Sequence, residues 1–167
     1  MKKNSLWLAL LLSCFPAAAF ATDMDHGDHQ PSTQHGYSNI QKINAELTIE
    51  NATAKATIPG TKVSSGYMKI INKSDKAITL IGATSVIAKH TEFHRMFMRD
   101  SQMAMRKVDA LEIPAKGSVT LASNGYHLMF MGVKNALKAN QVITVNMQQA
   151  NGEQFDMQLL VMPRKKH

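Results

Sequence analysis

The chain has 167 residues, 44% of them hydrophobic, which is enough for one core of ordinary size and too little for a second full domain. Its formal net charge is +7, a moderate excess of basic residues. The single cysteine is Cys14, so the rest of the chain can form no disulfide, zinc–thiolate site or nucleophilic thiol. Twelve methionines and seven histidines are the unusual feature of the composition.

The first 21 residues have the pattern of a secretory signal peptide. Two lysines precede an apolar run at residues 6–12, and the small residues Ala19 and Ala21 fit cleavage after Ala21. The run is about half of the ~20 apolar residues that a membrane span needs, so we expect no transmembrane segment. This pattern predicts export to the periplasm. The alternative is a lipoprotein, because residues 11–14 resemble a lipoprotein box in which Cys14 would carry the lipid.

Residues 22–37 contain almost nothing apolar, and we expect a disordered tail there. Imidazoles and carboxylates cluster in it, and such groups favour harder or borderline ions such as Cu(II) or Zn(II). The candidate auxiliary ligands in the tail are Met24, His26, His29 and His35. The alternative is a solvated acidic tail with incidental histidines.

Residues 38–167 are predicted to form one all-β domain. From about Ile40 onward, short runs rich in β-branched and aromatic residues alternate with turn residues, mostly about a dozen positions apart. Such spacing is typical of an antiparallel β-sandwich or barrel. Asn151-Gly152 predicts a hairpin with a primed turn. The one expected helical turn spans residues 133–137.

The strand at residues 127–131 separates two kinds of side chain. Because side chains alternate across a strand, Leu128 and Phe130 lie on one side and are predicted to fill the core. The other side then holds His127, Met129 and Met131.

Residues 93–98 show the same separation. Phe93 and Phe97 share one side of the strand. The opposite side holds His94, Met96 and Met98. Met103 and Met105 follow a turn at residues 100–102, on a strand that can return beside the first.

Histidine and methionine on shared strand faces indicate a copper site. Thioether sulfur is soft and uncharged, so it suits Cu(I) and suits Zn(II), Mg(II) or Ca(II) poorly, whereas imidazole binds both copper states. A thiolate site is liable to oxidation outside the cytoplasm, whereas methionine is more resistant. The absence of cysteine from this region also excludes a blue-copper centre. The competing interpretation is that methionine fills gaps in the core, and to this role we assign Met68, Met147, Met157 and Met162.

The spacing of these residues is specific. His94 is followed by ten residues and Met105, then by twenty-one residues and His127, then by one residue and Met129. This pattern resembles the motif of the periplasmic copper chaperones of the PCuAC type, as do the flanking Glu92-Phe93 and Ile113-Pro114-Ala115. One departure is Ser123-Asn124-Gly125, where that family usually has Pro-Gly-Gly.

The resemblance covers about residues 40–162 and implies a cupredoxin-like fold. It implies one Cu(I) bound through His94, Met105, His127 and Met129. It also implies a carrier that delivers copper toward assembly of the copper centre of cytochrome c oxidase, with an oxidase subunit or a thioredoxin-like copper protein as the acceptor. We expect a monomer. Whether further methionines take part is left open. These auxiliary candidates are Met96, Met98, Met103 and Met131.

Other classes of function are less well supported by the sequence. The chain has no nucleophile, phosphate-loop or dinucleotide motif, so we expect no enzymatic activity. Its lysines are scattered without interleaved aromatic residues, so we expect no nucleic-acid partner. Two alternatives stay open: a periplasmic copper storage or resistance protein, and an interaction module whose methionine-rich rim binds an apolar peptide.

Overall fold

The computed structural model describes residues 37–164, and all regular structure in this part of the chain is β. No helix occurs among these residues, and so none that could cross a membrane. The strands are β1 (Ile40–Lys42), β2 (Leu47–Lys55), β3 (Val63–Asn72), β4 (Ile78–Thr84), β5 (His90–Arg99), β6 (Gln102–Lys107), β7 (Leu111–Ile113), β8 (Ser118–Leu121), β9 (Tyr126–Met131), β10 (Val142–Gln149) and β11 (Gln154–Met162).

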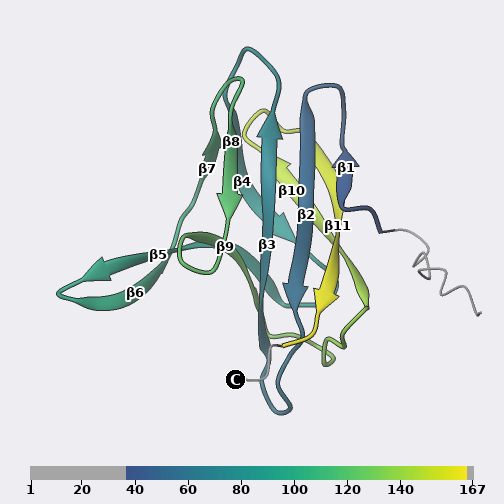
Figure 1. Ribbon diagram of the computed structural model, residues 1–167, viewed down its shortest axis with the longest axis vertical. Helices are drawn as coiled ribbons and strands as arrows, with labels where there is room; N and C mark the ends of the chain where they lie inside the picture. The colour runs from purple at the N-terminus through teal and green to yellow at the C-terminus, as the bar shows by residue number, and fades with distance from the viewer. Residues whose placement is uncertain (1–36, 165–167) are drawn as a thin grey trace, which may run out of the picture. The chain divides into compact units, whose positions relative to one another are not determined.

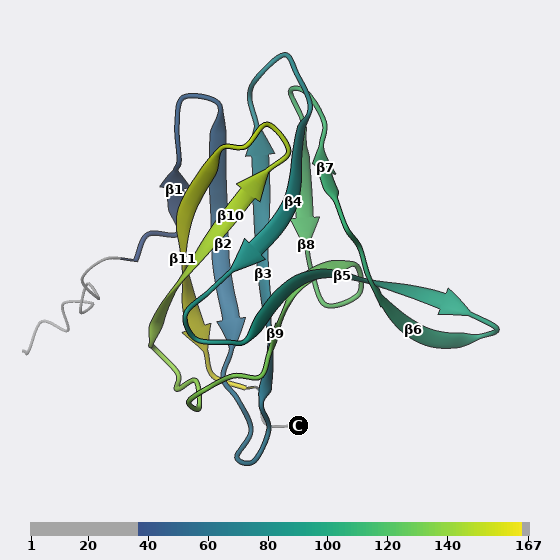
Figure 2. The same ribbon diagram turned by 180° about the vertical axis from the view of Figure 1, so that it is seen from behind.

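The strands pair in a closed ring. Its order is β5, β9, β3, β2, β11, β10 and β4, and β4 returns to β5 through the single pair Ala83 and Thr91. A sheet closed in this way encloses its core. The β5–β6 hairpin leaves the ring and projects away from the other strands (Figures 1 and 2).

The predicted all-β fold is confirmed, and two of its strand pairs are parallel where antiparallel strands were expected. β2 pairs with β11 in parallel, as β8 does with β9. The parallel contact of β8 with β9 is a single pair, Leu121 and Tyr126. Strands joined by a tight hairpin turn pair in antiparallel fashion. No such turn joins β2 to β11, which come from opposite ends of the domain, so their relative direction follows from ring closure.

Turn geometry differs from expectation at one hairpin. β10 and β11 pair as predicted, but only Gly152 of their turn has a positive φ, 90°. The Gly152 N–H donates to the Gln149 carbonyl at 3.0 Å, which gives a three-residue turn rather than the primed two-residue turn. The primed form occurs instead between β5 and β6, where Asp100 and Ser101 have φ values of 49° and 63°.

The expected helical turn at residues 133–137 is absent. The backbone N–H groups of this segment donate to other segments: Val133 to the Lys62 carbonyl and Lys134 to the Ile87 carbonyl. Val133 and Leu137 are buried, so the segment covers the core as a loop.

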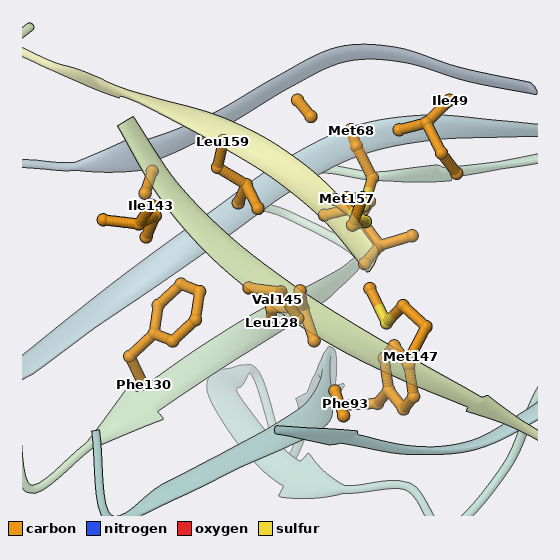
Figure 3. Close-up of a cluster of buried hydrophobic side chains, with 14 of the residues drawn as sticks. Ile49, Met68, Phe93, Leu128, Phe130, Ile143, Val145, Met147, Met157 and Leu159 are labelled. Atoms are coloured by element: carbon orange, nitrogen blue, oxygen red, sulfur yellow. The ribbon is translucent and has the colours of Figure 1, made fainter. Parts of the chain in front are cut away.

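The core contains the side chains that the strand alternation assigned to it. Phe93, Leu128 and Phe130 point inward with aliphatic residues of the opposite strands (Figure 3). The methionines expected in the core divide three to one: Met68, Met147 and Met157 are buried, and Met162 is 43% exposed. Met162 follows the buried Val161 on β11, so alternation turns it outward.

The predicted signal peptide and the tail up to residue 36 lie outside the described residues. Tyr37, assigned to the end of the tail, lies against β2, where its hydroxyl donates to the Ala52 carbonyl at 2.8 Å.

Candidate metal centre

Three adjacent strands bring the two histidines together. β5 pairs with both β6 and β9, and His94 lies directly opposite His127. Directly opposed residues point to the same side of a sheet. The imidazole ring centroids are 6.2 Å apart and the rings are tilted by 39°.

Met105 on β6 completes a contact with this pair. Its sulfur lies 3.2 Å from His127 Nε2. For two ligands of one tetrahedral metal ion, with bonds of about 2.1 Å to nitrogen and about 2.3 Å to sulfur, the two donor atoms are about 3.6 Å apart. His127 and Met105 are therefore close to the separation that a shared ion requires.

The hydrogen bond of His127 determines which of its nitrogens is available. Nδ1 lies 3.1 Å from the Gly125 carbonyl. Because a carbonyl can only accept, Nδ1 carries the proton, and the lone pair is on Nε2, the atom beside the Met105 sulfur. Metal-binding histidines commonly donate their second N–H to a carbonyl or carboxylate in this way.

His94 has the complementary arrangement. Its Nε2 lies 3.1 Å from Glu92 Oε2, and its Nδ1 is buried and has no hydrogen-bond partner. The Nε2–H therefore donates to the carboxylate, and the lone pair of Nδ1 is unused. An orphaned buried nitrogen is costly unless a ligand occupies it.

Glu92 is held in its charged form by its neighbours. The hydrogen bond from His94, and then Lys107 Nζ at 3.3 Å, lower the pKa of Glu92 from its ordinary value, against partial burial, which acts in the opposite direction. The motif includes Glu92 without indicating its role. Its position two residues before His94, on the same strand face, is the signal that could have identified its role.

The site is closed at the histidines and open at Met105. His127 is 5% exposed and the His94 side chain 11%, whereas Met105 is 47% exposed. Of these three residues, Met105 is therefore the one that an ion or a partner's ligand can reach most easily.

Met129, the fourth residue of the motif, lies on the same face. It is two residues along β9 from His127, half-buried, and directly opposite Glu92. The structure thus places all four motif residues on one side of β5, β6 and β9, while Phe93 and Leu128 lie in the core on the other side.

The auxiliary candidates fall into separate places. Met131 lies opposite His90 at the far end of β9, away from the β5–β6 hairpin. Met96, Met98 and Met103 are on that hairpin with Met105. Met24, His26, His29 and His35 lie outside the described residues. Within residues 37–164, no group of three His, Cys, Asp or Glu side chains is placed to hold a metal ion.

Comparison with known proteins gives a family and a fold. The family described as "Putative lipoprotein LpqE-like" matches residues 47–161. "Putative lipoprotein Lxx21020" of Leifsonia xyli subsp. xyli (strain CTCB07) is 30% identical over 107 residues, covering 64% of this chain and 63% of that relative. The matched region thus spans less than two thirds of that relative's length.

Solved structures resemble the chain over most of its length. Apo-DR1885 from Deinococcus radiodurans is 26% identical, with a TM-score of 0.58, over 93% of this chain and 96% of that one. The Cu(I) form of DR1885 is 28% identical, with a TM-score of 0.55, over 79% and 86%. The copper-bound PCuAC domain from PmoF2 has a TM-score of 0.64 over 76% of this chain and all of that one, and at 18% identity it shows the fold alone. The predicted cupredoxin-like fold is therefore confirmed. The chain has the fold of PCuAC copper-binding domains.

Proposed function

Since the chain belongs to the LpqE-like family, we propose that it is an extracytoplasmic copper chaperone that binds one Cu(I) ion and releases it to an acceptor by ligand exchange. The proposed ligands are His94, Met105, His127 and Met129. Cu(I) is the cargo of this protein, and no chemical change at the ion is required.

One observation carries the proposal. Each histidine uses one ring nitrogen in a hydrogen bond to the protein and leaves the other with an unused lone pair, and at His127 that nitrogen lies 3.2 Å from a methionine sulfur. Two neutral nitrogens and uncharged thioethers form a soft donor set, which favours Cu(I) over divalent ions. The Cu(I) form of the 28% identical DR1885 supports the same cargo.

The difference in exposure supports transfer rather than storage. A storage site gains from enclosing all of its ligands, whereas Met105 is 47% exposed beside two buried histidines. A ligand from an acceptor can replace the Met105 sulfur first, and the remaining bonds can then exchange one at a time. The proposed acceptor, an oxidase subunit or a thioredoxin-like copper protein, rests on the resemblance of the motif.

The location and the tail are further parts of the proposal. The family and the Leifsonia relative are both named as lipoproteins, which supports a place outside the cytoplasm. These names also support the alternative interpretation of the first segment, in which Cys14 carries a lipid and the chain is not cleaved after Ala21. The tail cluster around His26 and His29 is proposed as a weak Cu(II) site.

The test is competition for Cu(I) against a chelator under reducing conditions. Met105→Leu should lower the Cu(I) affinity at least tenfold because it removes a soft donor. The matched control is Met162→Leu, which alters another exposed methionine on a strand outside the site and should leave the affinity unchanged. Equal affinity of Met105→Leu and the wild type would contradict the ligand set.

A second experiment separates carrier from store. Copper-loaded protein is mixed with an apo acceptor domain, and the rate of transfer is compared with the rate of spontaneous copper release. Transfer faster than release, and dependent on acceptor concentration, is expected for ligand exchange. Transfer limited by release would indicate storage, and failure to bind Cu(I) at all would favour the peptide-binding module.

A further inference from the structure

The β5–β6 hairpin carries four methionines on one face. In the pairing of these strands, Met96 lies opposite Met105 and Met98 lies opposite Met103. We call these four residues the methionine ladder. Opposed side chains start about 5 Å apart at Cβ, and successive rungs are about 6.6 Å apart along the strand.

The ladder is not part of the core. Met98 is 61% exposed and Met103 is 55% exposed, so neither side chain is filling a gap between packed strands. Single exposed apolar residues are ordinary, but a contiguous exposed patch indicates a binding function. The hairpin projects from the ring (Figure 1), and three of the four methionines, Met98, Met103 and Met105, are exposed.

The other face of the hairpin holds the arginines. The Arg106 guanidinium lies 5.2 Å from the Phe97 ring centroid, and that of Arg95 lies 5.1 Å from the Tyr126 ring centroid. These contacts hold two positive groups on the face opposite the ladder. The four ladder side chains are uncharged sulfur donors. The nearest charges on their own face belong to Lys107, opposite His94, and to Glu92, which pair at 3.3 Å.

The end of the ladder farther from the hairpin turn, Met96 and Met105, lies beside the proposed Cu(I) site. Met105 is opposite Met96 and also touches His127 Nε2. Exposure decreases along this line, from Met98 at the tip through Met105 to the buried His127. Met105 is thus common to the ladder and the proposed Cu(I) site.

We propose that the methionine ladder is a second, entry site for a soft monovalent d10 cation, held by Met98, Met103 and Met96. Methionine is unbranched with three rotatable bonds, so thioethers from two adjacent rungs can converge on one ion. The ion then moves to the histidine pair by exchanging one metal–sulfur bond at a time through Met105, with no change in oxidation state. This inference extends the proposed function, because the entry site serves the proposed Cu(I) site.

The experiment is NMR of the protein labelled with 13C at its methionine methyl groups. The sample is titrated with Ag(I) and, under reducing conditions, with Cu(I). Both ions are diamagnetic, so each methionine reports its own binding. The first equivalent should shift the methyl signals of Met105 and Met129, and the second should shift those of Met98, Met103 and Met96. In the double variant Met98→Leu/Met103→Leu, the second step should be lost while the first is unchanged. Met162→Leu is the control and should retain both steps.

The outcomes separate this inference from the proposed function. If Met105 and Met129 respond but Met98 and Met103 stay unshifted at excess metal, the entry site is wrong and the main site stands. If the ladder signals shift but those of Met129 do not, the proposed Cu(I) ligands are wrong and the ladder is an independent site. Leucine is apolar and similar in size to methionine, and both substituted positions are exposed, so loss of folding does not confuse these results.

Discussion

The two histidines of the site show how hydrogen bonds select a donor atom. His127 donates from Nδ1 to a backbone carbonyl, and His94 donates from Nε2 to Glu92. Each bond fixes the ring orientation and leaves the other nitrogen for a ligand. At the residue scale, Glu92 is therefore a positioning residue, although it contributes no donor to the proposed ion.

We expect Glu92→Gln to weaken Cu(I) binding by about 10- to 100-fold, the range usual for partners of metal-binding histidines. The amide removes the charge that orients His94 and pairs with Lys107. Chelator competition measures the change. Lys107→Gln is the matched control, because it breaks the same ion pair while leaving the bond from His94 to Glu92, and it should have a smaller effect. If both variants bind as the wild type does, Glu92 does not position His94.

The same carboxylate predicts a pH dependence of stability. Its pKa is lower in the folded protein than the ordinary value of 4.5, chiefly because of the bond from His94. A lowered pKa means that the stabilisation is present above pH 4.5 and is lost as the pH falls through the folded value. Urea unfolding of metal-free protein should therefore show the wild type losing stability relative to Glu92→Gln below pH 4.5. A constant difference down to low pH would contradict the assignment.

Met129 allows copper binding to be separated from packing. Met129→Leu conserves volume and should cost less than about 1.5 kcal/mol of stability. The Cu(I) affinity should nevertheless fall, because one soft donor is removed. Thermal unfolding of the metal-free protein and chelator competition test the two parts. A changed melting temperature with unchanged affinity would make Met129 a packing residue.

At the scale of the strands, local pattern predicted side-chain direction well. Alternation placed Leu128 and Phe130 in the core and His127 and Met129 on the other side, as the structure has them. Turn residues marked where strands end, but the type of each turn depends on φ values that Asn-Gly alone does not determine. Local sequence does not determine the parallel pairing of β2 with β11, because it joins segments about a hundred residues apart.

For the site, spacing identified residues but not atoms. The motif named His94 and His127, yet the free nitrogen of each ring depends on bonds to Glu92 and Gly125 in three dimensions. The ladder likewise depends on the register between β5 and β6, which a turn at Asp100 and Ser101 sets.

A substitution at Tyr37 tests whether the ordered domain begins at this residue. Tyr37→Phe removes the hydrogen bond to the Ala52 carbonyl and should cost about 1 kcal/mol at neutral pH. Burial raises the pKa of Tyr37 above 10.0, so this contribution should be complete below pH 10.0 and lost as the pH rises through the folded value. Urea unfolding of both proteins from neutral to alkaline pH measures it. No difference at neutral pH would show that Tyr37 belongs to the tail.

At the scale of the whole domain, the closed ring and the projecting hairpin have separate roles. The ring buries the core and holds β5 and β9 in place. Phe93 on β5 and Leu128 on β9 pack in this core, on the side of each strand opposite its histidine (Figure 3). The hairpin carries Met105 and the exposed sulfurs out from that support. A rigid nitrogen pair with an accessible sulfur is suited to both capture and release of an ion.

The proposed site binds one Cu(I) through a mixed set of two imidazoles and two thioethers. X-ray absorption on protein loaded with a single equivalent of Cu(I) counts the nitrogen and sulfur neighbours directly. We expect two nitrogen and two sulfur neighbours in the wild type, and one sulfur neighbour fewer in Met105→Leu. A first shell of nitrogen and oxygen alone, or of sulfur alone, would contradict it.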